Sequence, residues 1–148
     1  MRFSRDISGI PIIDEATGRI LGHVGEWLLD QHGEAVVAFT AESGGWLPQK
    51  KVISYINVVS LGDDAVLVDG SLFEPDIKEI TDACSVLGKR VITAAGQELG
   101  LVDDILFDED TGKVTGLRLT SGLIDDLLSG RPVLEKQFTI GEGVLIVQ

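Results

Sequence analysis

The sequence predicts an all-β protein with one or two short helices, folded as two tandem, small antiparallel β-barrels. Three observations support this fold class. Glycines and hydrophobic residues recur 78 or 79 positions apart, as between Val24 and Val102 or Gly9 and Gly88. The hydrophobic fraction is 44% and there are 18 glycines, which suits short strands joined by tight turns. Apolar residues also alternate over short stretches that end at turn-forming residues.

The repeat divides the 148-residue chain into two copies. Residues 18–30 parallel residues 96–108, with glycine, valine and aspartate at matching positions. We expect one barrel in residues 1–70, a connector in 71–84 and a second barrel in 85–148. Two copies are too few for a solenoid, and domains of about 60 to 70 residues bury little surface alone. The two barrels should therefore pack together, related by an approximate internal twofold.

Each copy is expected to begin with a short strand, at residues 10–13 and 89–93, that ends at turn signals. A longer strand and a hairpin follow. In the second copy the hairpin turn at residues 108–112 has an aspartate at its start and a glycine for a position with positive φ. The final strands are predicted at residues 65–68 and 144–147.

The long strand of each copy carries an irregular hydrophobic spacing. Val24, Trp27 and Leu29 are separated by three and then two positions, and the second copy repeats this spacing. Such a shift predicts a β-bulge at residues 25–26 and another at residues 103–104. Trp27 is expected to lie in the core.

Residues 121–130 differ from the strands around them. Ser121 can cap a short helix, Gly130 can end it, and four aliphatic residues form one stripe. Residues 44–48 are the corresponding place in the first copy, where two glycines and a proline oppose a helix. A further helical turn is expected to begin at Pro75 in the connector.

Charge and hydropathy exclude several classes of protein. A formal net charge of −12 repels phosphate backbones, so we expect no direct nucleic-acid binding. A protein partner with a basic surface fits this charge better. No apolar run approaches the roughly 18 residues of a membrane span, and residues 1–6 hold no signal-peptide core. We therefore expect a cytoplasmic protein without a transmembrane segment.

No set of residues predicts catalysis or cofactor binding. The single cysteine, Cys84, has no histidine in its own half of the chain to act as a base, and is expected to be a small apolar residue. His23 and His32 have no acid at a metal-ligand spacing and are expected at exposed or edge positions. We therefore expect no enzyme, and we assign no catalytic, cofactor or metal residues.

The densest acidic group comprises Asp103, Asp104 and residues 108–110. It is not a calcium loop of the EF-hand type, because Lys113 and Leu119 stand where that loop requires glycine and glutamate. We expect this group to be a solvated hairpin.

One pattern of glycines, hydrophobic residues and turns joins these elements. In the second copy it consists of Gly88, Val91, Ile92, Leu99, Gly100, Val102, Ile105, Asp108, Gly112 and Val114. This pattern resembles the PRC-barrel domain family, which is named for the cytoplasmic H subunit of photosynthetic reaction centres. A similar barrel forms the C-terminal part of a ribosome maturation factor. Residues 122–131 are also similar to a segment of bacterial proteins with two such barrels, so the resemblance implies tandem PRC-type barrels.

Two functional hypotheses remain. The first is a non-catalytic module for protein–protein interaction or assembly. The resemblance implies a ribosomal protein or a membrane complex as the partner. With a membrane complex as partner, the protein would lie at the periphery of the membrane. The second is a regulatory domain that binds a small molecule or an ion between the two copies. The oligomeric state stays open and includes a homodimer.

Six hydrophobic residues are candidate contacts with a partner. A tryptophan and a leucine follow two glycines in the first copy, and the aliphatic stripe of the predicted helix either covers its own barrel or docks on another protein. These candidates are Trp46, Leu47, Leu123, Ile124, Leu127 and Leu128.

Overall fold

The computed structural model describes residues 1–43, 49–70, 83–120, 133–134 and 138–147. These residues form strands and two short 3-10 helices. The elements of the first half are β1 (Arg2–Phe3), η1 (Ser4–Ile7), β2 (Pro11–Asp14), β3 (Ile20–Leu29), β4 (Val36–Ser43), β5 (Gln49–Ser54), η2 (Tyr55–Asn57), β6 (Val58–Leu61) and β7 (Val66–Val68). Those of the second half are β8 (Arg90–Thr93), β9 (Glu98–Phe107), β10 (Val114–Thr120), β11 (Val133–Leu134), β12 (Phe138–Ile140) and β13 (Val144–Val147).

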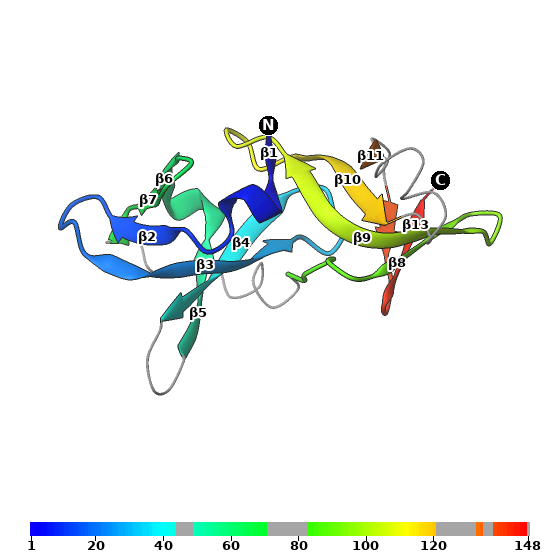
Figure 1. Ribbon diagram of the computed structural model, residues 1–148, viewed down its shortest axis with the longest axis horizontal. Coiled ribbons are helices and arrows are strands. Elements are labelled where there is room, and N and C mark those ends of the chain that lie inside the picture. The colour runs from blue at the N-terminus through cyan, green and yellow to red at the C-terminus, as the bar shows by residue number, and fades with distance from the viewer. Residues whose placement is uncertain (44–48, 71–82, 121–132, 135–137, 148) are drawn as a thin grey trace.

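The strands form two sheets with the same strand order. The first sheet runs β5-β4-β3-β2-β7-β6 and the second runs β11-β10-β9-β8-β13-β12. Figure 1 shows the first sheet on the left and the second on the right. The predicted all-β class with two tandem barrel units is confirmed. One difference is that each sheet contains a parallel pair, β2 with β7 and β8 with β13, because the last strand of each copy returns beside the first.

Both predicted bulges are present in the long strands. The register between β3 and β4 shifts between Val24 and Trp27, and the pairing of β9 with β10 skips Asp103. At Gly25 a side chain would not fit, because a Cβ there would lie 2.4 Å from the Thr40 hydroxyl oxygen. That oxygen accepts the backbone N–H of Glu26 at 2.8 Å. The bulge therefore depends on a glycine that lets the Thr40 hydroxyl reach the backbone.

The two halves share one hydrophobic core. Its centre is aromatic, with ring centroids of Trp27 and Phe39 5.0 Å apart and those of Trp27 and Phe107 5.3 Å apart. Tyr55 packs edge-on against both Trp27 and Phe107. Trp27 is only 2% exposed, so the prediction that it lies in the core is confirmed. Because Phe107 belongs to the second half and the other three rings to the first, neither half has this core alone.

Reciprocal backbone hydrogen bonds join the halves. The N–H of Val36 donates to the carbonyl of Gly112 at 2.7 Å, and the N–H of Val114 donates to the carbonyl of Glu34 at 2.9 Å. Val36 and Val114 are equivalent positions of the repeat, as are Glu34 and Gly112. The bonds are thus images of each other, as the predicted internal twofold requires.

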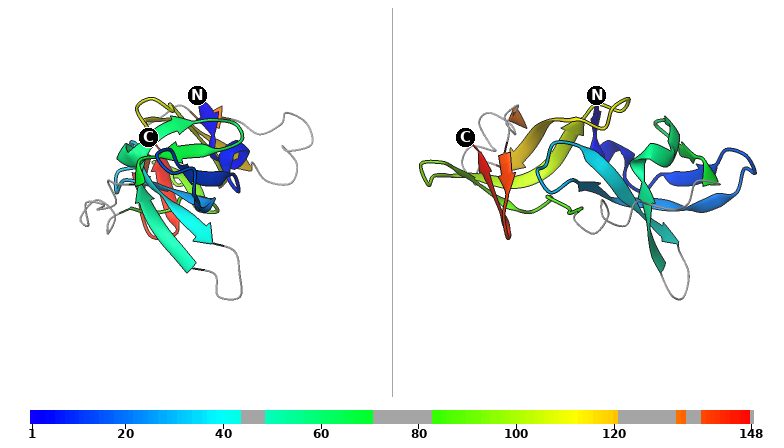
Figure 2. Two further views of the ribbon diagram at one scale, coloured as in Figure 1. Left: turned by 90° about the vertical axis from the view of Figure 1, so that its left-hand side faces the viewer. Right: turned by 180° about the vertical axis from the view of Figure 1, so that it is seen from behind.

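The segment that leads into each half pairs with the long strand of the other half. β1 is antiparallel to β9, with Phe3 opposite Leu106. Cys84 and Leu29 exchange both of their backbone hydrogen bonds, at 2.9 and 3.0 Å. The right-hand view in Figure 2 shows the N-terminus between the two sheets. The domain boundaries near residues 70 and 85 stay a prediction, but β1 lies on the second sheet although its sequence precedes the first.

Asp103 and Asp104 are buried, so the prediction of a solvated acidic hairpin is wrong for these two residues. Asp104 is 1% exposed, and its Oδ1 accepts the Ser4 hydroxyl at 2.6 Å and the Arg5 N–H at 3.0 Å. The Arg5 guanidinium lies 3.3 Å from Asp103. The bulge and the N-terminal segment together place both carboxylates inside, where the bonds to Asp104 Oδ1 and the Arg5 guanidinium beside Asp103 offset part of their desolvation. Asp110 at the turn is exposed, as expected.

The helices of the described residues were not predicted. η1 and η2 are single turns in segments where no helix is expected. The predicted helix at 121–130 and the turn at Pro75 lie outside the described residues.

Gly112→Ala should destabilise the protein more than Gly96→Ala. Both glycines have positive φ, +77° and +84°, so alanine is strained at either position. A Cβ on Gly112 would lie 2.8 Å from the carbonyl oxygen of Val36, whereas one on Gly96 meets nothing within 4 Å. We expect urea denaturation to show an additional loss of roughly 1–3 kcal/mol for Gly112→Ala. Equal losses would contradict the close approach of the two halves at this turn.

Asp104→Ala should lower the free energy of unfolding by about 1–3 kcal/mol or more, because the buried Ser4 hydroxyl and Ile105 N–H and the partly buried Arg5 N–H lose their acceptor. Asp64→Ala, at an exposed turn, is the matched control and should change it by less than about 0.5 kcal/mol. Thermal melts of both variants measure the difference. If Asp104→Ala melted like the control, the buried carboxylate would not hold the N-terminal segment.

Candidate binding groove between the two halves

A groove of about 670 Å³ lies where the two halves meet. One wall is η2 and β6 of the first half, and the other is the turn at residues 109–111 of the second half. The volume is within the range of about 300–1,000 Å³ that is usual for ligand sites. Segments that are about 50 residues apart in sequence therefore form one concave surface.

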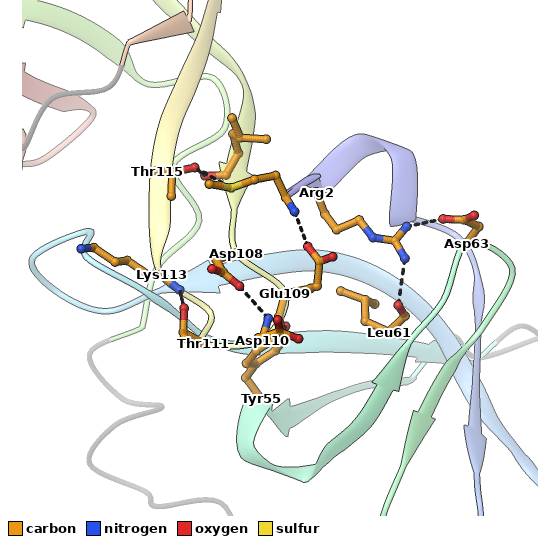
Figure 3. A network of polar contacts seen from close by, with 12 residues as sticks. Arg2, Tyr55, Leu61, Asp63, Asp108, Glu109, Asp110, Thr111, Lys113 and Thr115 are labelled. Carbon is orange, nitrogen blue, oxygen red and sulfur yellow. Dashed lines mark hydrogen bonds and ion pairs between the residues drawn. The ribbon is translucent and has the colours of Figure 1, made fainter.

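The turn that forms the second wall is shaped by its own side chains. The Asp108 carboxylate accepts the N–H of Asp110 at 2.8 Å, and its carbonyl accepts the N–H of Gly112 at 2.7 Å. The Thr111 hydroxyl accepts the N–H of Lys113 at 3.2 Å. The predicted aspartate-initiated turn with a positive-φ glycine is confirmed. Figure 3 shows this turn, and its residues Glu109 and Asp110 line the groove.

Tyr55 connects the two walls. Its hydroxyl donates to the carbonyl of Glu109 at 2.5 Å (Figure 3). Burial, with a smaller contribution from the nearby carboxylates of Glu109, Asp108 and Asp110, raises the pKa of Tyr55 to about 12. The phenol is therefore neutral at ordinary pH, and it stays a hydrogen-bond donor to the turn.

The N-terminal segment contacts both walls of the groove, at Leu61 and at Glu109. The Arg2 guanidinium pairs with Asp63 and also donates to the carbonyl of Leu61 at 2.8 Å. The amino group of Met1 lies 2.6 Å from Oε2 of Glu109, and this hydrogen bond lowers the Glu109 pKa below its usual value. Figure 3 shows both contacts, one at each side of the segment. Arg2 thus links β6 of the first half to a segment that lies on the second sheet.

Two aliphatic side chains stand in water at the groove. Ile56 is 79% exposed and Val59 is 52% exposed, and both belong to the first wall. Ser60 and Thr111 add hydroxyl groups to the lining. The groove therefore offers an apolar wall facing an acidic turn.

The six predicted partner contacts, Trp46 and Leu47 with the stripe of Leu123, Ile124, Leu127 and Leu128, all lie outside the described residues. His23 and His32 are exposed, as predicted. In the part of the chain that the structure describes, no three His, Cys, Asp or Glu residues are grouped so as to hold a metal ion. Within the same residues, no helix has the length and hydrophobicity to cross a membrane.

Sequence reasoning missed Ile56 and Val59, because both fit a buried strand as well as an exposed one. The one sequence feature that could have indicated an irregular element here was the length of the stretch 54–60, which exceeds what one strand of this small repeat needs. That excess holds the single turn of η2, which turns Ile56 outward.

Tyr55 should titrate near pH 12, rather than at its ordinary value of 10.0. It is the only tyrosine in the chain, so the absorbance of the phenolate reports this residue alone. Because the folded-state pKa is raised, the unfolded chain loses the proton first, so this contribution to stability is complete below pH 10 and is lost as the pH rises to 12.

Tyr55→Phe is the control for the dependence of stability on pH. Because phenylalanine does not ionise, the free energy of unfolding of this variant should lack the extra loss between pH 10 and 12. A midpoint near 10 in the folded protein would contradict the buried contact with the turn.

Two comparisons place this fold among known proteins. The profile of the PRC-barrel domain matches residues 1–72 and 79–147. The uncharacterized protein YrrD of Bacillus subtilis (strain 168) is 20% identical over 146 residues, covering 96% of this chain and 83% of YrrD. The family resemblance seen in the sequence is thus confirmed over nearly the whole chain. With one match in each half and the same strand order in both sheets, the protein belongs to the PRC-barrel domain family.

Proposed function

We propose that this protein is a non-catalytic module for protein–protein interaction or assembly, and that the groove between its halves is a docking surface. The observation that carries the proposal is the pair Ile56 and Val59, which are 79% and 52% exposed beside a concave surface. Clustered apolar side chains that stand in water next to a groove are typical of interaction sites. Covering them would remove apolar area from water at about 25 cal/mol per Å².

The chemistry of the groove supports binding rather than catalysis. The ionisable side chains that line it are Tyr55, Glu109 and Asp110. Tyr55 is held neutral and bonded to the turn, and the described lining offers no histidine, lysine or cysteine beside the hydroxyls of Ser60 and Thr111. The described residues of the groove thus do not combine a nucleophile, a general base and a group that orients the base, as a catalytic site would.

A second candidate function is a regulatory domain that binds a small molecule or an ion between the two barrels. The position of the groove favours it, since one wall comes from each half. A ligand there would contact both halves and stabilise their association, because binding only to the folded state raises stability by mass action. A thermal-shift screen with metal ions and metabolites tests this alternative.

Other features of the function stay proposals. Family resemblance favours a ribosomal protein or a membrane complex as the partner, and a location in the cytoplasm or at the edge of such a complex. Two units at residues 1–70 and 85–148, joined by a connector at 71–84, are part of the same proposal. The hydrophobic residues at 46–47 and 123–128 are proposed as further contacts with the partner, or with a second copy of the chain.

Ile56→Ser should abolish capture of the partner while leaving the melting temperature nearly unchanged, because Ile56 is exposed. Ile146→Ser is the matched control: Ile146 is 40% exposed on β13, in the other half. Affinity capture with the wild type and both variants, quantified by mass spectrometry, should show a protein lost only with Ile56→Ser. If both variants captured the same proteins as the wild type, the groove would not be the docking surface.

A further inference from the structure

We propose that the groove between the two halves receives a segment of a partner protein that presents lysine or arginine beside an aliphatic residue. This inference rests on the proposed docking function and adds the chemistry of the partner. Its basis is the pairing of an acidic turn with an apolar wall across one concave surface. Each wall selects a different part of the incoming segment.

The acidic wall selects for positive charge. Glu109 and Asp110 line the groove, and among the described residues no lysine or arginine does so. Asp110 is exposed, and its carboxylate has no hydrogen-bond or ion-pair partner among the described residues. The whole chain carries a formal charge of −12, which attracts a basic partner from a distance and repels a nucleic acid. An incoming lysine or arginine would form an ion pair with the Asp110 carboxylate.

The apolar wall selects for a neighbouring aliphatic group. Ile56 and Val59 are the exposed hydrophobic residues of this wall, and they line the same groove as the acidic turn. A free metal ion or a simple diamine would leave both side chains in water. A protein segment covers them and brings its cation to Asp110 in the same event, so both walls contribute to affinity.

A similar contact between a basic side chain and an acidic one exists within the chain itself, at the end of β6. Arg2 is presented by the extended strand β1, and it reaches both the Asp63 carboxylate and the carbonyl of Leu61. A basic side chain on an extended segment thus already docks on this edge of the first sheet (Figure 3). A partner would repeat the arrangement further along, where Asp110 is still available.

The test uses a fluorescent eight-residue peptide that alternates valine with lysine, and a second peptide with glutamate in place of lysine. Fluorescence anisotropy with the full chain should show binding of the lysine peptide, weakened by added salt, and no binding of the glutamate peptide. Asp110→Lys should weaken the binding at least about tenfold, as expected for loss of a close charge pair. Glu142→Lys, an exposed site in the β12–β13 turn, makes the same change in net charge and should weaken it far less.

Several outcomes would overturn the inference. Equal binding of both peptides, no binding of the lysine peptide, or equal effects of Asp110→Lys and Glu142→Lys would each do so. Spermine binding as tightly as the peptide would favour a small cation instead, and binding of a single-stranded oligonucleotide would favour nucleic acid. The proposed docking function fails separately, when Ile56→Ser leaves partner capture unchanged. If capture depends on Ile56 but the lysine peptide does not bind, only the basic character of the partner is wrong.

Discussion

The reciprocal hydrogen bonds across the internal twofold are the constraint on which the rest of this structure depends. Val36 donates to Gly112 and Val114 donates to Glu34, so the two hairpin turns are tied back to back. Domains of this size bury little surface and are only marginally stable alone. Joining them at their turns brings Trp27, Phe39 and Phe107 into one core, which supplies the burial that each half lacks. The two copies of the motif thus share one hydrophobic core.

The groove follows from this junction. Tyr55 packs on Phe107 from the other half and donates to the Glu109 carbonyl, so the position of η2 is set by contacts across the junction. β6 continues directly from η2, and it holds Val59 beside the acidic turn. A rigid scaffold that fixes both walls limits the entropy lost when a partner binds. The same contacts that stabilise the fold therefore preorganise the proposed docking surface.

The two copies differ at several core positions where they meet. Trp27 in the first copy corresponds to Ile105 in the second, and Leu29 corresponds to Phe107. At each of these two positions one copy has an aromatic ring and the other has a smaller aliphatic side chain. An exact twofold would bring two copies of each side chain together at the axis, where the space for four large rings is limited. At the bulge, Gly25 in one copy corresponds to Asp103 in the other, whose carboxylate is satisfied by Arg5. The different side chains at these equivalent positions let the two halves pack against each other.

The sequence by itself determined the repeated strands, the turn at Asp108, both bulges and the burial of Trp27. These features depend on residues close together in the chain, through hydrophobic spacing and the positive φ of glycine. Only the tertiary structure decided that Asp104 is buried, since its partner Ser4 lies 100 residues away, and that β1 joins the second sheet. It also decided the groove, because the exposure of Ile56 and the position of Asp110 arise from packing between the halves, which no local pattern encodes.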